Sequence, residues 1–475
     1  MAEVLIANKW GHDRALSGKP WILFFAIEAV IGILFVFSPY LSVVTVFGVA
    51  LFLLGAYTSP TLVYALILLS IPSQYTTHGT RGMADIKLVH FATAAGIIAW
   101  ALQWVKRKTI EIDIRWMDVP ILLFIGWAVT SALWSVDPQR TLFFDIKLIG
   151  AFATYFVLIF LIRDKVALNR VLLIWLVVYF LWSVAGLYTM LFVSIPEAEK
   201  VKIAHDVVTK LGKTVRVSAV FANPNELAFF LSIATIVAVV NYRIRPSKFW
   251  KILAVVSILV ASAVLLGTFS RKSWLAILLS VSILSIKDRR VLLACLVIGL
   301  LSFVFVVGWV GSDRFVEALY NRFSSFLLEP EVAMEERVAS WTIAMDLFVR
   351  APLIGSGAGA YYALAPAVGS ELPIPHNLYV LLLVEYGLVG LGIFLLISCV
   401  FASGLIRIMK VHKDPQIRYV ALGLFAVLVS VLFQAFFKTL AFTNYNFLCF
   451  FALLSSFLRI HGCGNTCREV RRYVS

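Results

Sequence analysis

The fold is decided by an apolar run that follows directly after a histidine, because residues 375–403 read PHNLYVLLLVEYGLVGLGIFLLISCVFAS. From Leu378 the run is long enough for one helix to cross a hydrocarbon core of about 30 Å, which requires about 20 residues. His376 and Gly387 are eleven positions apart, and eleven helical steps of about 100° place both on one face. Because Gly387 leaves room for a close neighbour, we expect a titratable ring at the mouth of a membrane bundle.

Similar runs fill most of the chain, of whose 475 residues 61% are hydrophobic and only 14% charged. Soluble domains carry about 25% charged residues, and barrel strands would alternate apolar and polar residues, which these runs do not. The runs occupy residues 21–37, 41–57, 59–72, 88–105, 119–135, 147–162, 171–194, 218–241, 252–269, 273–286, 291–310, 378–403, 419–437 and 444–460. The sequence therefore predicts an all-α, polytopic transmembrane bundle of 12–14 spans, the number depending on the three short runs at the start.

Basic clusters recur between the runs, for example at residues 106–108, 243–251 and 407–418. The positive-inside rule places them, and both termini, in the cytoplasm. The net charge of +15 is thus a topology signal, and we expect no nucleic-acid partner. The loops expected on the other face are 73–87, 136–146, 195–217, 270–272, 311–377 and 438–443.

The longest polar interruption divides the chain into three parts. We expect N-terminal transmembrane helices over residues 1–310, a large partly helical outer loop over 311–377, and C-terminal helices with a basic cytoplasmic tail over 378–475. Within the loop, Val338, Trp341, Met345 and Phe348 recur at spacings of three and four. This spacing predicts an amphipathic helix over residues 335–350 that lies on the bundle or in the interface.

Arginines are unusually frequent on the predicted outer face, where the positive-inside rule should deplete them. They are Arg140, Arg216, Arg271, Arg314, Arg322, Arg337 and Arg350. Guanidinium groups bind phosphate oxygens in bidentate fashion, so arginines gathered at a membrane surface suit a diphosphate with a lipid tail. Arg216, Arg271 and Arg337 stand out because each adjoins a span or the amphipathic helix.

Polar residues also open the span near residue 224, where the chain reads NPNE from Asn223 to Glu226. Amides and carboxylates in a membrane usually line a cavity or an interhelical contact. Asn223 followed by a proline equally fits an N-cap and a helix start, and the sequence leaves both interpretations open. Glu385 is offset from His376 by about 180° on a helix, so we expect it to face another helix and hold Lys438 or an arginine.

His376, flanked by Pro375 and Asn377, lies where the chain re-enters the membrane, and a neutral imidazole there can accept a proton from a hydroxyl. The sequence has no nucleotide-binding motif, and neither Cys463 nor Cys467 has a standard zinc spacing. We therefore expect no metal and no cofactor. Because the cytoplasmic loops are too short for a sugar-nucleotide domain, any glycosyl donor should be lipid-linked and presented on the outer face.

Taken together and in order, the motifs resemble the O-antigen ligase and polymerase superfamily of bacterial membrane glycosyltransferases. The matching features are WSVDP at 134–138, Arg216 with NPNE at 223–226, Ser270-Arg271, Arg337 with Trp341, the glycines 355, 357 and 359, and His376-Asn377 followed by Gly387.

The resemblance implies a metal-independent, GT-C-like enzyme of the bacterial inner membrane that uses an undecaprenyl-diphosphate-linked glycan on the periplasmic face. By position, His376 would be the general base, and Arg216, Arg271 and Arg337 would hold the diphosphate. Asn377, Asn223 and Asn225 are secondary candidates. Besides membrane lipids, the partners are a lipid-linked glycan donor and a glycan or lipid A-core acceptor.

Three other functions remain open: an O-antigen or exopolysaccharide polymerase, a protein O-oligosaccharyltransferase, and a transporter or flippase of lipid-linked glycans. A transporter should carry charged or broken helices near the middle of the membrane, whereas the ionisable residues of this sequence crowd toward the surfaces.

Overall fold

The computed structural model describes residues 60–72, 88–107, 114–192, 217–219, 221, 223–310, 330–364, 375–438 and 444–462, and only the backbone of residues 60, 102–107, 309–310 and 330–337. Across these ranges the regular elements are helices and no strand occurs, which confirms the predicted all-α fold. Seven of the described helices are long and apolar enough to cross a membrane. The chain is a polytopic helical membrane protein.

The predicted apolar runs from 59–72 onward each coincide with a helix, and the runs 21–37 and 41–57 lie outside the described residues. The helices are α4 (Pro60–Ser70), α5 (Leu88–Arg107), α6 (Val119–Thr130) with the 3-10 turn η4 (Ser131–Leu133), α7 (Pro138–Leu161), α8 (Lys165–Phe192), α10 (Pro224–Ile244), α11 (Lys248–Gly267), α12 (Arg271–Ser285), α13 (Arg289–Val310), α15 (Pro330–Arg350), α16 (Ala360–Leu364), α17 (Leu378–Val411), α18 (Pro415–Ala435) and α19 (Tyr445–His461).

Three helices begin at an Asp-Pro or Asn-Pro pair. Asp137, Asn223 and Asp414 each accept a hydrogen bond from a backbone N–H in the first turn of α7, α10 or α18, and the following proline supplies the helical φ. As a result, α7 starts at residue 138 and not at 147. The prediction of an outer loop over 136–146 is therefore wrong for most of its length, because the cap outweighs the low hydropathy of that turn.

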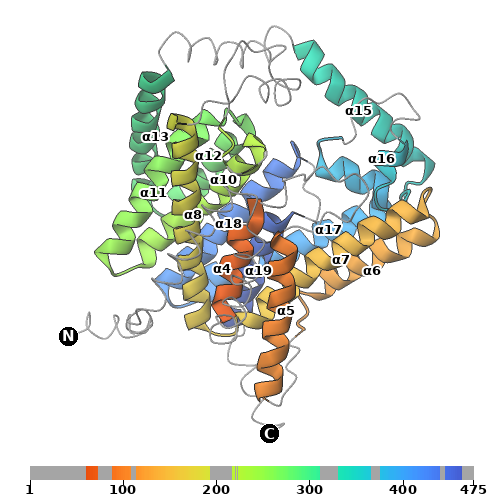
Figure 1. The fold of residues 1–475 in the computed structure, drawn as a ribbon, viewed down its shortest axis with the longest axis horizontal. Helices are drawn as coiled ribbons and strands as arrows, with labels where there is room; N and C mark the ends of the chain where they lie inside the picture. The colour runs from red at the N-terminus through yellow and green to blue at the C-terminus, as the bar shows by residue number, and fades with distance from the viewer. Residues whose placement is uncertain are drawn as a thin grey trace, which may run out of the picture.

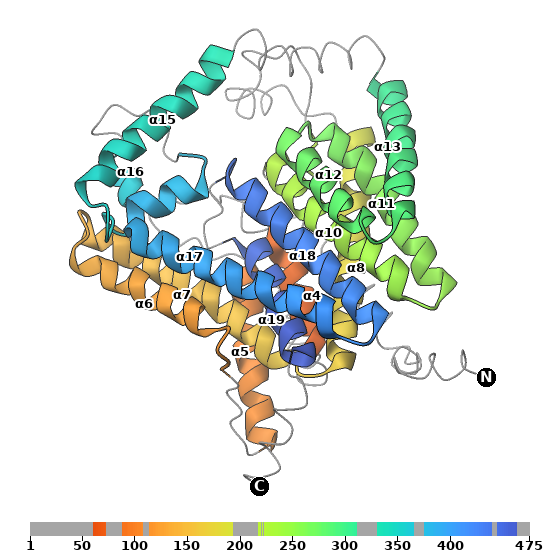
Figure 2. The same cartoon turned by 180° about the vertical axis from the view of Figure 1, so that it is seen from behind.

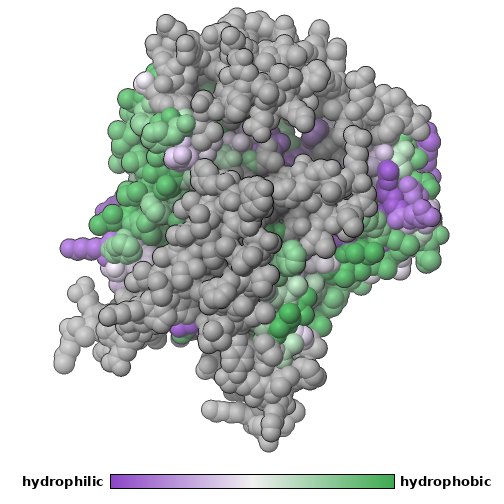
Figure 3. Space-filling model, in the orientation of Figure 1, coloured by the Kyte–Doolittle hydropathy of each residue, from purple (hydrophilic) through white to green (hydrophobic). Residues whose placement is uncertain are grey.

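Helix α10 lies at the centre of the bundle, where it packs against α8, α11, α12 and α18 (Figure 1). In the most apolar 18 residues of α10, 89% of the residues are buried, whereas the corresponding fraction for α13 is 11%. Figure 2 shows α17 and α18 crossing the opposite side as neighbours. Hydrophobic side chains cover the surface over α11 and α13 and along α6 and α7 (Figure 3), as expected of helices that face lipid.

The loop between α13 and α17 contributes α15 and α16, which fold back onto α17 through a small core of their own (Figure 1). Helix α15 confirms the predicted amphipathic helix and begins five residues earlier than predicted. Its buried face runs through Ala344 and Leu347, whereas Val338 and Met345 are exposed. The predicted face is therefore only partly right, because α17 covers the neighbouring stripe.

Candidate functional site

The chain returns to the bundle at His376, whose backbone is held in an unusual conformation. Its φ of +51° lies in the left-handed region, which costs a residue with a side chain about 1–2 kcal/mol. Asn377 then caps α17, since its side-chain oxygen accepts hydrogen bonds from the N–H groups of Tyr379 (2.9 Å) and Val380 (3.2 Å). The cap sets where α17 begins and therefore where the half-buried imidazole stands.

A tryptophan from the outer loop holds the residue before the histidine. The indole N–H of Trp341 on α15 donates to the carbonyl oxygen of Pro375 over 2.8 Å. Trp341 is itself packed against the small core that α15 shares with α16 and α17. This tryptophan of the predicted loop motif therefore ties α15 to the segment that carries His376.

Helix α17 is broken at Gly387, whose φ of 67° and ψ of −167° are not helical. His376 lies before the helix, so the prediction that it shares a helical face with Gly387 is wrong. The expected close neighbour is confirmed, because a Cβ atom at Gly387 would lie 2.3 Å from the carbonyl oxygen of Leu353 and 2.7 Å from the nitrogen of Gly355.

The loop after α15 fills this break with main-chain hydrogen bonds. The N–H groups of Ser356 and Gly357 donate to the carbonyls of Val384 and Glu385, at 2.8 and 2.9 Å. Below the break, the N–H of Leu388 donates to the carbonyl of Pro352 over 2.9 Å. The polar groups that the broken helix leaves open are thus satisfied by the loop, as burial in a membrane bundle requires.

The WSVDP motif at 134–138 binds the other side of the same loop. The N–H of Val136 donates to the carbonyl of Ser356 (3.2 Å), and the Thr141 hydroxyl donates to the carbonyl of Ala358 (2.8 Å). The indole of Trp134 reaches the carbonyl of Ile354 over 3.3 Å. Three motifs that lie far apart in the sequence therefore form one frame around the break in α17. They are WSVDP, the glycine loop 355–359 and Gly387.

Three helices begin around the C-terminal end of α18. Gln434 links two of them, because its side-chain oxygen accepts from the Ser273 hydroxyl of α12 (3.0 Å) and its nitrogen donates to Ser232 of α10 (2.9 Å). The third is α17, whose Tyr379 hydroxyl donates to the carbonyl of Leu432 over 2.9 Å. Three helix starts with partial positive charge thus surround one helix end with partial negative charge, so the dipoles at this rim favour an anion on balance.

Two cationic side chains lie at this rim. Arg271 is the first residue of α12 and is half-buried. Lys438 follows α18 and forms an ion pair with Glu226 of α10, with its ammonium 4.8 Å from the centre of the Phe229 ring. Burial lowers the pKa of Lys438, and Glu226 opposes that shift. The prediction that Glu385 holds Lys438 is wrong, because the lysine forms its ion pair with Glu226.

The remaining predicted site residues have different outcomes. Arg216 lies outside the described residues, and Arg337 belongs to α15 although its side chain is not described. Asn223 caps α10, with its side-chain oxygen 2.8 Å from the backbone nitrogen of Asn225. The N-cap interpretation of Asn223 is thus confirmed, and only its amide nitrogen could still donate to a ligand.

Two acids are buried inside the long helices. Glu385 of α17 is buried beside the N–H groups of Gly359 and Tyr361 at the start of α16, and its Oε1 atom makes no hydrogen bond to any described residue. Both carboxylate oxygens of Asp145 on α7 are buried and make no hydrogen bond to any described residue. Both acids are thus buried within the protein, and one of them lies beside the start of α16.

Across the described residues no group of three His, Cys, Asp or Glu side chains is arranged to hold a metal ion. Residues 256–395 match the protein family described as O-antigen ligase, and a search among curated proteins finds no match. The matched segment contains Arg271, the glycine loop, His376 and Gly387. The match confirms the resemblance drawn from the sequence motifs.

Proposed function

We propose, from the premise that this chain carries an O-antigen ligase domain over residues 256–395, that it transfers a glycan from undecaprenyl diphosphate to an acceptor hydroxyl. The proposal places the reaction on the periplasmic face of the bacterial inner membrane, with both termini in the cytoplasm. No metal takes part in it. Its starting point is that the chain is an O-antigen ligase-like membrane protein.

The observation that supports the proposal most is that three helix N-termini meet at one rim. One of them is the start of α17, which directly follows His376 and Asn377. The starts of α10, α12 and α17 surround the end of α18. Arg271 adds a positive charge there, and the charge of Lys438 is balanced by Glu226 of α10. A diphosphate leaving group carries the negative charge that such a rim stabilises, while its lipid tail can remain in the bilayer.

The proposed reaction is a single displacement. The acceptor hydroxyl attacks the anomeric carbon of the donor, His376 takes the hydroxyl proton, and the bond from the anomeric carbon to the phosphate oxygen breaks. Undecaprenyl diphosphate leaves with the electron pair of that bond, stabilised by Arg271, Lys438 and the predicted Arg216 and Arg337. Attack from the face opposite the leaving group inverts the anomeric centre.

A substitution that preserves the backbone tests the base. Asparagine tolerates the left-handed region, so His376→Asn should keep the cap geometry and remove the imidazole. A matched control is His412→Gln, because His412 is the C-cap residue at the other end of the same helix. Both variants are expressed in a strain that lacks the gene, and surface glycan is read by gel electrophoresis.

We expect the His412 variant to restore surface glycan and the His376 variant to lose it by at least about a hundredfold, the usual scale for a general base. Equal amounts of both proteins in the membrane fraction show that insertion is unaffected. Wild-type glycan levels in the His376→Asn strain would exclude the proposed base. The gel also separates two reactions, since loss of a polymerase leaves single repeat units on the acceptor and loss of a ligase leaves none.

A further inference from the structure

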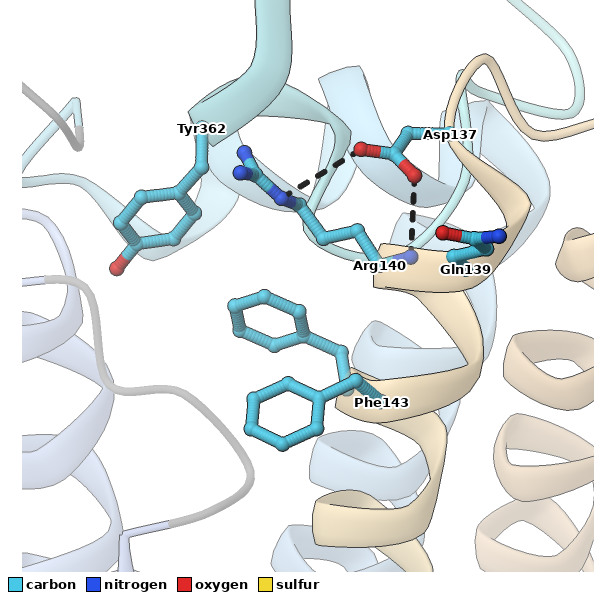
Figure 4. Close-up of a pocket in the computed structure, with 6 residues that line it drawn as sticks. Asp137, Gln139, Arg140, Phe143 and Tyr362 are labelled. Carbon is cyan, nitrogen blue, oxygen red and sulfur yellow. Dashed lines mark hydrogen bonds and ion pairs between the residues drawn. The ribbon is translucent and has the colours of Figure 1, made fainter. Parts of the chain in front are cut away.

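A groove of about 630 Å³ opens between the first turns of α7 and Tyr362 of α16. It is lined by Asp137, Gln139, Arg140, Phe143, Phe144 and Tyr362. Figure 4 shows Tyr362 reaching from α16 toward the side chains on the first two turns of α7. The transfer step described above uses none of these residues.

Aromatic rings form one wall of the groove. The rings of Phe144 and Tyr362 are stacked, with centroids 5.6 Å apart and planes 27° from parallel. Phe143 stands at right angles to Phe144, with centroids 6.3 Å apart. Phe143 and Tyr362 are 49% and 38% exposed, so part of each ring remains open toward the groove.

Hydrogen-bonding groups form the other wall. The carboxylate of Asp137 lies 3.6 Å from the guanidinium of Arg140 and also accepts the backbone N–H of that residue. Gln139 adds an amide that both donates and accepts. Burial and the nearby carboxylate of Glu385 raise the pKa of Tyr362, so its hydroxyl stays neutral and can donate.

The charge of the groove argues against an anionic ligand. Its one acid and one base are paired with each other, so the lining carries no net charge. The ammonium of Lys147 lies 4.0 Å from the centre of the Phe143 ring, outside the lining. A phosphate or an anionic headgroup would need unpaired cations inside the groove, whereas a neutral ligand rich in hydroxyls needs paired donors and acceptors beside an apolar face.

From this arrangement we infer that the groove binds a sugar chain, with the C–H face of a pyranose ring on the exposed part of the Tyr362 ring and its hydroxyls on Asp137, Gln139 and Arg140. The groove adjoins the frame around the break in α17, because Asp137 belongs to the WSVDP segment and Tyr362 follows the glycine loop, and both segments take part in that frame. The inference deepens the proposed function and rests on it for the source of the sugar chain, which is the acceptor or the donor glycan.

Photo-crosslinking identifies the occupant directly. The substitution Tyr362→p-benzoylphenylalanine keeps an aromatic ring at the groove, and the full-length protein is irradiated in its own membrane, purified and stained for carbohydrate. The matched control is Ile146→p-benzoylphenylalanine, since Ile146 lies on α7 just beyond the residues that line the groove, is 69% exposed and does not itself line it. We expect carbohydrate on the protein crosslinked at position 362 and none at 146.

Crosslinks at position 362 that contain only lipid or only peptide overturn the inference, and so does equal carbohydrate at both positions. The experiment is repeated in the His376→Asn background, where binding should persist although transfer stops. The groove is thereby tested separately from the proposed function. In cells that cannot make the lipid-linked glycan, a persisting crosslink assigns the sugar chain to the acceptor, and its loss assigns it to the donor.

Binding measurements on the purified chain in nanodiscs give the contribution of the ring. The probe is the sugar chain released by mild acid from the surface glycan of the expressing strain. Tyr362→Leu should weaken its binding about five- to tenfold, and Tyr362→Phe less than about twofold, because stacking and not the hydroxyl supplies most of the contact. Equal affinity of the leucine variant and the wild type contradicts the stacking contact.

Discussion

The break in α17 gives the sharpest test of the structure, through the substitution Gly387→Ala. Gly387 combines a φ of 67° with a ψ of −167°, a backbone conformation that is essentially restricted to glycine. The added methyl group would lie 2.3 Å from the carbonyl oxygen of Leu353 and 2.7 Å from the nitrogen of Gly355. Both contacts are to backbone atoms, so they are relieved only if the whole loop moves away.

Two costs add up. The backbone conformation alone costs a residue with a side chain about 1–3 kcal/mol. Moving the loop also breaks the hydrogen bonds from Leu388 and Val389 to the carbonyls of Pro352 and Leu353, now 2.9 and 3.2 Å long, at about 1 kcal/mol each. Gly387→Ala should therefore lower the free energy of unfolding by about 3–5 kcal/mol.

Gly392→Ala is the matched control, because a Cβ atom at Gly392, five residues further along α17, meets nothing within 4 Å. It should stabilise the helix by about 0.5–1 kcal/mol. Both free energies are measured by reversible unfolding in mixed micelles as the fraction of dodecyl sulfate is raised. If Gly387→Ala proved as stable as Gly392→Ala, the loop could not occupy the break as described.

Three further substitutions test other contacts. Trp341→Phe keeps a ring but removes the hydrogen bond to Pro375; it should cost less than about 1.5 kcal/mol of stability while slowing glycan transfer several-fold, and an unchanged initial rate would show that this tether does not position His376. Lys438→Met breaks the buried ion pair with Glu226 and should destabilise the protein by about 3–5 kcal/mol, of which the added change Glu226→Gln restores a large part; identical single and double variants would contradict the pairing. Asp118→Asn weakens the contacts of Asp118 with Arg459 and Tyr155, so thermal stability should fall while transfer per folded molecule stays at the wild-type rate, and a selective loss of transfer would contradict a purely structural role.

The positions of the helices could be predicted from the sequence because hydrophobicity is a local property. Hydropathy alone places the start of α7 too late, because it treats the polar residues Gln139 and Arg140 as part of a loop. The pair Asp137-Pro138 in fact caps and begins the helix. A pair of the same kind stands at Asn223-Pro224, where the sequence leaves the cap as one of two interpretations, and α10 begins at that proline. Capping pairs thus locate helix ends that average hydrophobicity misses.

The candidate site could be predicted only in part. The sequence shows three separate motifs, namely WSVDP, the glycine loop and Gly387. They meet around one break through main-chain hydrogen bonds, which no residue type encodes. The partner of Lys438 was also out of reach, since Glu226 and Glu385 are both acids near a membrane surface. Which of them the lysine meets is decided by the packing of α10 against α18.

The capping asparagines determine which groups of the proposed diphosphate site remain available to a ligand. The side-chain oxygens of Asn223 and Asn377 already accept N–H groups of α10 and α17, so these oxygens and those N–H groups are not available to a ligand. An anion at the rim would then be stabilised by the dipoles of the capped helices and by the side chains of Arg271 and Lys438. The caps contribute by holding those charges in place before the donor arrives, so less has to reorganise when charge develops on the leaving group.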